Sequence, residues 1–161
     1  MIDSSSSSAI EQIDYDANYP LGLIGGGIAM LVGAAIWGAV TYFTEYQIGY
    51  MAIGLGFLVG IAFRFFGKGH SMLFGLSSAG LSLIGCVLGN LLFYTGVIAR
   101  DEGTSFLEIL LFLVTNPLAV IELFTLAFDF RDLLFYALAA YVGFRVALDK
   151  SQTQPQTAQS Q

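Results

Sequence analysis

Three long apolar runs with almost no charge restrict what this chain can fold into. The first, residues 21–43, contains no charged side chain. As an α-helix it would rise about 34 Å, slightly more than the roughly 30 Å of a bilayer's hydrocarbon core. The second run, residues 48–66, has one charge, Arg64, near its end, and the third, residues 71–99, has none. Runs of this kind predict transmembrane helices.

The composition suits a bilayer better than water. Charged residues make up 11% of the chain and hydrophobic residues 56%, whereas a soluble domain carries about 25% charged residues. Lipid tails accept apolar side chains on the outside of a fold, and water does not. The six Lys and Arg residues provide no basic face that could displace counterions from phosphates. We therefore expect the lipid bilayer as a partner, and no nucleic acid.

A fourth span is expected over residues 130–148, although this run is less apolar. Only 12 residues separate Asp132 from Arg145, so the span requires Arg145 to extend toward the headgroups, as long basic side chains do. The expected fold is an all-α integral membrane bundle of four transmembrane helices. Its spans are about 20–43, 48–66, 71–99 and 130–148, in a membrane domain over residues 20–148.

Both ends of the chain predict disordered tails. Residues 1–19 are acidic and rich in Ser, and residues 149–161 consist mostly of Gln, Ser and Thr. Segments with so few apolar side chains cannot bury enough surface to offset the entropy of ordering.

Two short amphipathic helices, residues 105–115 and 117–128, are predicted before the last span. Asn116 and Pro117 indicate a helix stop and a new start, with Asn116 as the cap and Pro117 in the first turn. Each piece is too short to cross a bilayer alone. An uninterrupted helix over residues 106–128 would contradict this hinge.

The polar side chains of this segment leave its place in the membrane open. Glu108 and Glu122 lie on polar stripes, which favours an interfacial or re-entrant helix pair at the outer membrane face. The alternative is one kinked span, a fifth, that contains both acids. Placing an acid at the bilayer centre costs roughly 3 kcal/mol on insertion scales, which argues against this alternative.

Small residues recur at four-residue spacing along the predicted spans. Helices in lipid associate by close backbone approach, which small residues permit. The expected helix-packing residues are Gly25, Ala29, Gly33, Gly56, Gly60, Gly85 and Gly89. They predict a tightly packed bundle, and such faces can also bind another membrane protein or a second copy of the chain.

Few residues in the sequence are candidates for chemistry. His70 is the single histidine and Cys86 the single cysteine, whereas a metal site uses three or four ligands. We therefore expect no metal and no cofactor. Asn90 is the most polar side chain well inside a span, where an interhelical hydrogen bond is the usual role. Together with Glu108 and Glu122, it forms the candidate polar or ion site.

Part of the chain resembles a group of known proteins. Residues 42–69, YFTEYQIGYMAIGLGFLVGIAFRFFGKG, contain a QIGYMAIG-G-FLVG core, a basic residue and GKG. This pattern resembles a family of uncharacterised bacterial four-helix inner-membrane proteins. Residues 84–92, IGCVLGNLL, and residues 132–145, DLLFYALAAYVGFR, are similar to later segments of that family. The resemblance implies the fold and a bacterial inner membrane, and it implies no activity.

These patterns favour a non-enzymatic role. We expect a small membrane scaffold or accessory subunit that packs through glycine-rich helix faces. The alternative is a transporter or channel for a small solute or ion, which would use Glu108, Glu122 and Asn90.

The basic residues predict how the chain is oriented in the membrane. Those on one side of the predicted bundle are Arg64, Lys68, Arg145 and Lys150, and those on the other are Arg100 and Arg131. Because basic residues accumulate in the cytoplasm, both termini are expected on the cytoplasmic side.

Cysteine accessibility tests this orientation. In a Cys86→Ala background, Ser4→Cys and Ser151→Cys are expected to be protected from an impermeant thiol reagent in intact cells, and Glu45→Cys to react. Labelling at residue 4 with protection at residue 45 would reverse the orientation. Labelling at residue 151 but not at residue 4 would establish an odd number of spans, with residues 105–128 as the fifth.

Overall fold

The computed structural model describes residues 18–44, 49–69, 71–127 and 130–148. Its helices are α2 (Tyr19–Thr44), α3 (Tyr50–Gly67), α4 (Met72–Glu102), α5 (Phe106–Thr115), α6 (Pro117–Ala127) and α7 (Phe130–Leu148). These described segments are almost wholly helical and contain no strand. Nearly all of the two predicted tails, together with His70, lies outside the described residues.

The long helices confirm that the chain has the character of a membrane protein. Helices α2, α3 and α4 are each long and apolar enough to cross a membrane, and the bent α5–α6 pair is a fourth candidate if it is counted as one span. Helix α7 is not among the candidates, because three of its 19 residues, Arg131, Asp132 and Arg145, are charged.

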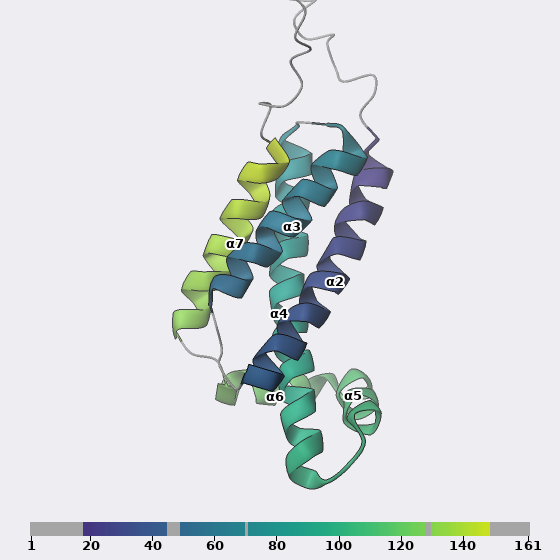
Figure 1. The fold of residues 1–161 in the computed structure, drawn as a ribbon, viewed down its shortest axis with the longest axis vertical. Coiled ribbons are helices and arrows are strands. Elements are labelled where there is room, and N and C mark those ends of the chain that lie inside the picture. The colour runs from purple at the N-terminus through teal and green to yellow at the C-terminus, as the bar shows by residue number, and fades with distance from the viewer. Residues whose placement is uncertain (1–17, 45–48, 70, 128–129, 149–161) are drawn as a thin grey trace, which may run out of the picture.

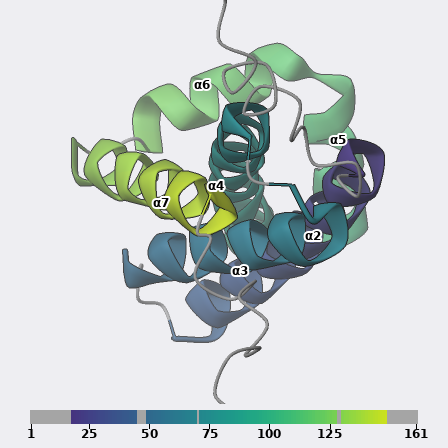
Figure 2. The ribbon, with the colours of Figure 1, turned by 90° about the horizontal axis from the view of Figure 1, so that it is seen from above.

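Helix α7 nevertheless packs as a full member of the bundle. Helices α2, α3, α4 and α7 stand side by side along the long axis of the molecule (Figures 1 and 2). Helix α7 packs extensively against both α3 and α4, and α2 packs against the same two helices from the other side. The bundle is therefore a ring of four neighbours.

Two helix ends illustrate how local backbone geometry sets the boundaries. Helix α3 stops where Lys68 adopts a left-handed conformation (φ 52°) and its N–H bonds to the Arg64 carbonyl. The sequence predicts that α4 ends near Ala99, but the helix continues through three charged residues as far as Glu102. Arg and Glu are good helix formers, so the helix ends only at Gly103, whose φ of 65° is a left-handed conformation that glycine adopts without strain.

The α5–α6 pair is broken where the sequence predicts it. The two helices meet at Asn116 with a bend of 105°. Pro117 takes the first position of α6, where its missing N–H costs nothing. The Asn116 side chain does not act as the expected cap of α6. Its Nδ2 instead donates to the Phe112 carbonyl at 2.9 Å and closes the end of α5.

Both short helices lie across the bundle axis rather than along it. Figure 1 shows α5 end-on and α6 crossing beneath the bundle, and Figure 2 shows them curving around α4. We call this α5–α6 pair the collar. It contacts the rest of the molecule chiefly through α5 against α4.

Glycines bring α3 and α7 into backbone contact. A Cβ atom on Gly56 would overlap the carbonyl oxygen of Ala139. One on Gly60 would lie 3.0 Å from the carbonyl oxygen of Gly143, inside normal contact distance. Larger side chains at these two positions would separate the helices.

The same principle operates between the other helices. Leu55 of α3 fits between Gly33 of α2 and Gly85 of α4, where a Cβ atom would lie 3.2 and 2.8 Å from its side chain. Gly89 of α4 lies against Trp37 of α2 in the same way, at 3.1 Å. The two other expected packing residues, Gly25 and Ala29, are buried in α2. All seven therefore lie on buried faces of the bundle helices.

A matched pair of glycines on α3 tests the backbone contact. Gly56→Ala is expected to lower the free energy of unfolding by about 1–3 kcal/mol, because the new methyl group must displace the Ala139 carbonyl. Gly54, two residues away, meets nothing within 4 Å, so Gly54→Ala should be neutral or stabilise by up to about 1 kcal/mol. Thermal unfolding in detergent measures both, and equal effects of the two changes would contradict the packing.

Candidate functional site

Polar side chains recur every fourth residue along α4 and follow α7. The row consists of Ser78, Ser82, Cys86, Asn90 and Tyr94. The first four are buried and Tyr94 is partly buried. Neighbours four residues apart share a helix face, and the contacts of the row identify the facing helix as α7. We call this set the polar row.

The serine end of the row binds the α7 backbone. The Ser78 hydroxyl donates to the Gly143 carbonyl at 3.0 Å, and the Ser82 hydroxyl donates to the Ser78 carbonyl at 2.8 Å. A Cβ atom on Gly143 would lie only 2.5 Å from the Ser82 oxygen. Gly143 therefore lets α7 approach closely enough for its carbonyl to accept this bond.

Asn90 lies near the middle of the row and is 2% exposed. Its Nδ2 donates to the Tyr136 hydroxyl of α7 at 2.6 Å. The Asn90 Oδ1 has no hydrogen-bond partner among the described residues. A buried amide that joins two helices is the ordinary role of asparagine in a span.

The row ends at a carboxylate. The carboxylate of Asp132, in the first turn of α7, is close enough to the phenols of Tyr94 and Tyr136 to interact electrostatically with both. The carboxylate of Asp132, the phenols of Tyr94 and Tyr136, and the amide of Asn90 thus lie along the contact between α4 and α7. The sequence carried a signal for this arrangement in the four-residue spacing from Ser78 to Tyr94, but only packing reveals which helix the row faces.

Two further buried polar groups lie on α2. Trp37 Nε1 and Thr41 Oγ1 are buried and have no hydrogen-bond partner among the described residues. Trp37 belongs to the same hydrophobic cluster as Cys86 and Tyr136. Unsatisfied buried groups are rare in native structures, so these two groups are unusual features of the bundle interior.

The expected polar or ion site is not assembled by this fold. Glu108 and Glu122 are exposed on α5 and α6, whereas Asn90 is buried against α7. Within the described segments, no three His, Cys, Asp or Glu side chains come together as metal ligands would. The acid that interacts with Tyr136, the hydrogen-bond partner of Asn90, is instead Asp132. In the sequence, Asp132 marks only the start of the last predicted span.

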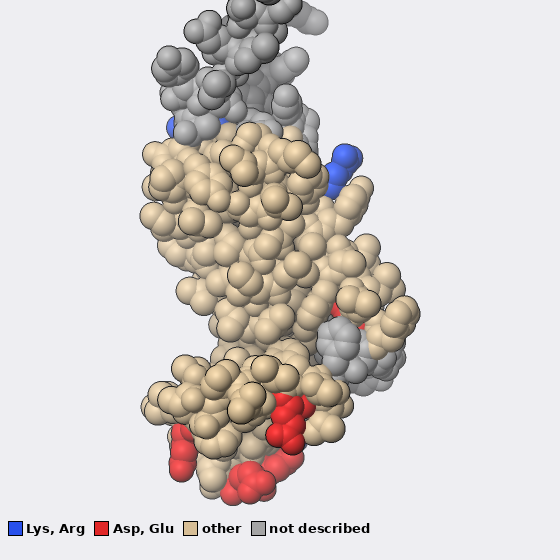
Figure 3. Space-filling view, turned by 180° about the vertical axis from the view of Figure 1, so that it is seen from behind, with Lys and Arg blue, Asp and Glu red and all other residues tan. Residues whose placement is uncertain are grey.

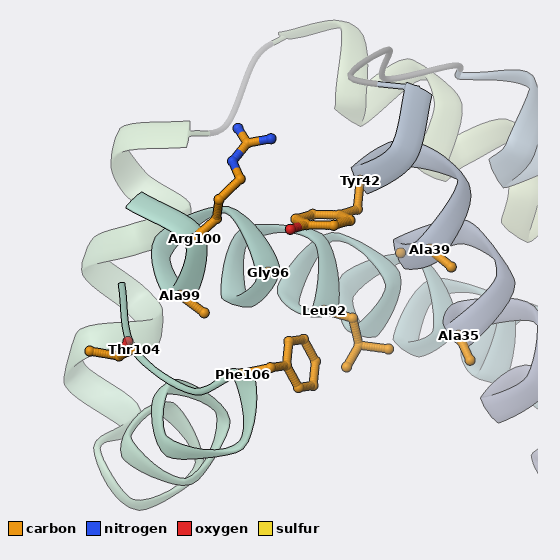
Figure 4. A pocket seen from close by; sticks show the side chains of 10 residues that line it. Ala35, Ala39, Tyr42, Leu92, Gly96, Ala99, Arg100, Thr104 and Phe106 are labelled. Carbon is orange, nitrogen blue, oxygen red and sulfur yellow. The ribbon is translucent and has the colours of Figure 1, made fainter. Parts of the chain in front are cut away.

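A hollow of about 620 Å³ opens between α2, α4 and the start of α5. Its lining is mostly apolar, and Arg100 and Tyr42 lie at one end (Figure 4). The Arg100 guanidinium stands over the Tyr42 ring, 5.7 Å from its centre, within the range of a cation–π contact. The sequence alone does not predict this hollow, because its lining residues on α2 and α4 lie far apart in the chain and meet only through packing.

Comparison of the chain with protein-family models, with curated proteins and with solved structures finds no match. A role for the chain is therefore proposed from its own fold and surfaces.

The Asn90–Tyr136 bond can be tested by removing a single oxygen atom. Tyr136→Phe is expected to lower the free energy of unfolding by about 0.6–1.7 kcal/mol, the range for interhelical hydrogen bonds in membranes. Tyr141→Phe is the control, since Tyr141 is 60% exposed on the same helix. A double-mutant cycle with Asn90→Leu isolates the pair, and a coupling energy near zero would show that the bond contributes nothing.

Proposed function

We propose that this chain is a non-enzymatic scaffold or accessory subunit of a bacterial inner membrane. In this proposal α2, α3, α4 and α7 are its four spans, both termini are cytoplasmic, and the collar lies at the outer face. The resemblance of residues 42–69 to bacterial inner-membrane proteins supports the choice of membrane.

The burial pattern of α7 supports its role as the fourth span. Its inward face, which includes Ala139 and Ala147, is fully buried against the bundle. Arg145 is exposed in the last turn, where it can reach the headgroups, and Asp132 lies in the first. The 19 residues rise about 28 Å, close to the thickness of the hydrocarbon core.

The distribution of charge supports the orientation. Figure 3 shows Lys and Arg near one end of the molecule and Asp and Glu gathered at the other. Arg64, Lys68 and Arg145 belong to the end where α3 and α7 finish. The acids Asp101, Glu102, Glu108, Glu122 and Asp132 belong to the end that carries the collar. The basic end is the cytoplasmic one by the positive-inside rule.

The collar is the surface that carries the scaffold proposal. Many of its apolar side chains are exposed, with Leu118 at 79% and Leu126 at 82%. The expected packing glycines already contact neighbouring helices of the same chain. Their faces are therefore not available to a partner protein. An apolar helix pair held crosswise can pack against the spans of a neighbouring membrane protein while Glu108 and Glu122 stay near water.

The competing class, passage of a small solute or ion through Glu108, Glu122 and Asn90, requires the collar to turn inward. The scaffold role requires no such movement, because the collar already projects from the bundle. We therefore favour the scaffold.

Site-specific photo-crosslinking tests the docking surface. A photoreactive residue at Leu118 or Leu126 is expected to give an adduct with the same membrane protein in native membranes. One at Ile28, a comparably exposed position on α2, should react with lipid alone. Leu118→Ser with Leu126→Ser should lower co-purification of that protein at least fivefold, and Ile28→Ser should not. Adducts only with a second copy of the chain, or with no protein, would overturn the proposal of a distinct partner.

A further inference from the structure

The hollow between α2 and α4 exists because the side chains around it are small. Ala35 and Ala39 of α2 are exposed and face Gly96 and Ala99 of α4 across it. Phe106, from the first turn of α5, covers one side (Figure 4). In a bilayer such a hollow does not hold water, because its walls offer almost no hydrogen-bonding groups. A lipid tail is the component of the surroundings that can fill it.

One end of the hollow is polar. The Arg100 guanidinium lies over the Tyr42 ring there (Figure 4). A guanidinium offers several N–H donors in a planar fork that matches phosphate oxygens. The ring beneath it limits the directions in which the fork can point. Arg100 is in the last turn of α4, where the helix leaves its apolar section.

The same end also carries negative charge. Arg100 Nε lies 3.6 Å from Asp101 Oδ1, and the two side chains are 48% and 64% exposed. An ion pair this exposed contributes little to stability, so a bound phosphate can compete for the guanidinium. Asp101, which lies beside Arg100, would then be close to the group that follows the phosphate. A cationic amine complements this carboxylate, whereas a neutral or anionic group does not.

We propose that the hollow binds one phospholipid with a zwitterionic, amine-bearing headgroup. One acyl chain occupies the apolar hollow, the phosphate binds Arg100, and the amine lies beside Asp101. The volume of about 620 Å³ falls within the roughly 300–1,000 Å³ of small-molecule sites. This site depends on the bundle standing in a bilayer and does not depend on the scaffold role, since Leu118 and Leu126 of the collar do not line it.

Native mass spectrometry of the purified full chain tests the site. The protein, in mild detergent, is mixed with equal amounts of phosphatidylethanolamine and phosphatidylglycerol that carry identical acyl chains. We expect one retained lipid per chain, with phosphatidylethanolamine favoured about fivefold. Arg100→Gln should lower retention of both lipids about tenfold, the effect of losing about 1.4 kcal/mol. Asp101→Asn should remove the preference between them.

Two substitutions separate the hollow from the general lipid-facing surface. Ala39→Phe fills the hollow from an exposed position and should abolish retention, whereas Ile28→Phe adds a similar ring elsewhere on α2 and should not. Arg145→Gln removes an exposed arginine at the other end of the bundle and is the control for Arg100→Gln. Circular dichroism and elution volume verify that each variant keeps its fold.

Three results would overturn the proposal. Equal retention by the wild type, Ala39→Phe and Arg100→Gln would mean that the lipid is bound nonspecifically around the bundle. Competition by glycerophosphoethanolamine as strong as that by a short-chain phosphatidylethanolamine would show that the tail contributes nothing. A preference for phosphatidylglycerol would refute the assignment of Asp101 to an amine.

Discussion

The backbone contact between α3 and α7 is the interaction on which the bundle depends. Helix α7 carries three charged residues. Its sequence alone therefore gives it only a weak preference for the lipid interior over water. Gly56 and Gly60 bring it against α3, and Gly143 brings it against α4 closely enough for Ser78 to donate to its backbone. Dispersion contacts and hydrogen bonds therefore hold α7 in place, as expected where lipid removes the hydrophobic contribution to helix association.

The polar row has its position because of this contact. Asn90 can donate to Tyr136 only while α7 is held alongside α4. A buried amide without this bond would have to satisfy its donors in an apolar interior, which is costly. The glycines and the hydrogen bonds thus support each other, and the register of α7 along α4 is specified at both the serine end and the tyrosine end of the row.

The sequence predicted those features that arise from local chemistry. Helix locations followed from apolar runs, and the break at Asn116-Pro117 followed from the missing N–H of proline. The apolar run predicts the end of α4 three residues early, because the charged residues that follow it continue the helix as far as Gly103. The hollow could not be predicted, since Ala39 and Gly96 lie far apart in sequence and come together only through packing. The hydrogen bond between Asn90 and Tyr136 could not be predicted for the same reason.

The crosswise collar also gives the molecule an unequal profile. Figure 3 shows a narrow waist between the bundle and the end that carries α5 and α6. If the bundle spans a bilayer with the collar at its outer face, lipid tails fill this waist between the bundle and the two crosswise helices. Such tails are enclosed by protein on more than one side. They would therefore exchange with the surrounding membrane more slowly than lipids along the outer faces of the bundle.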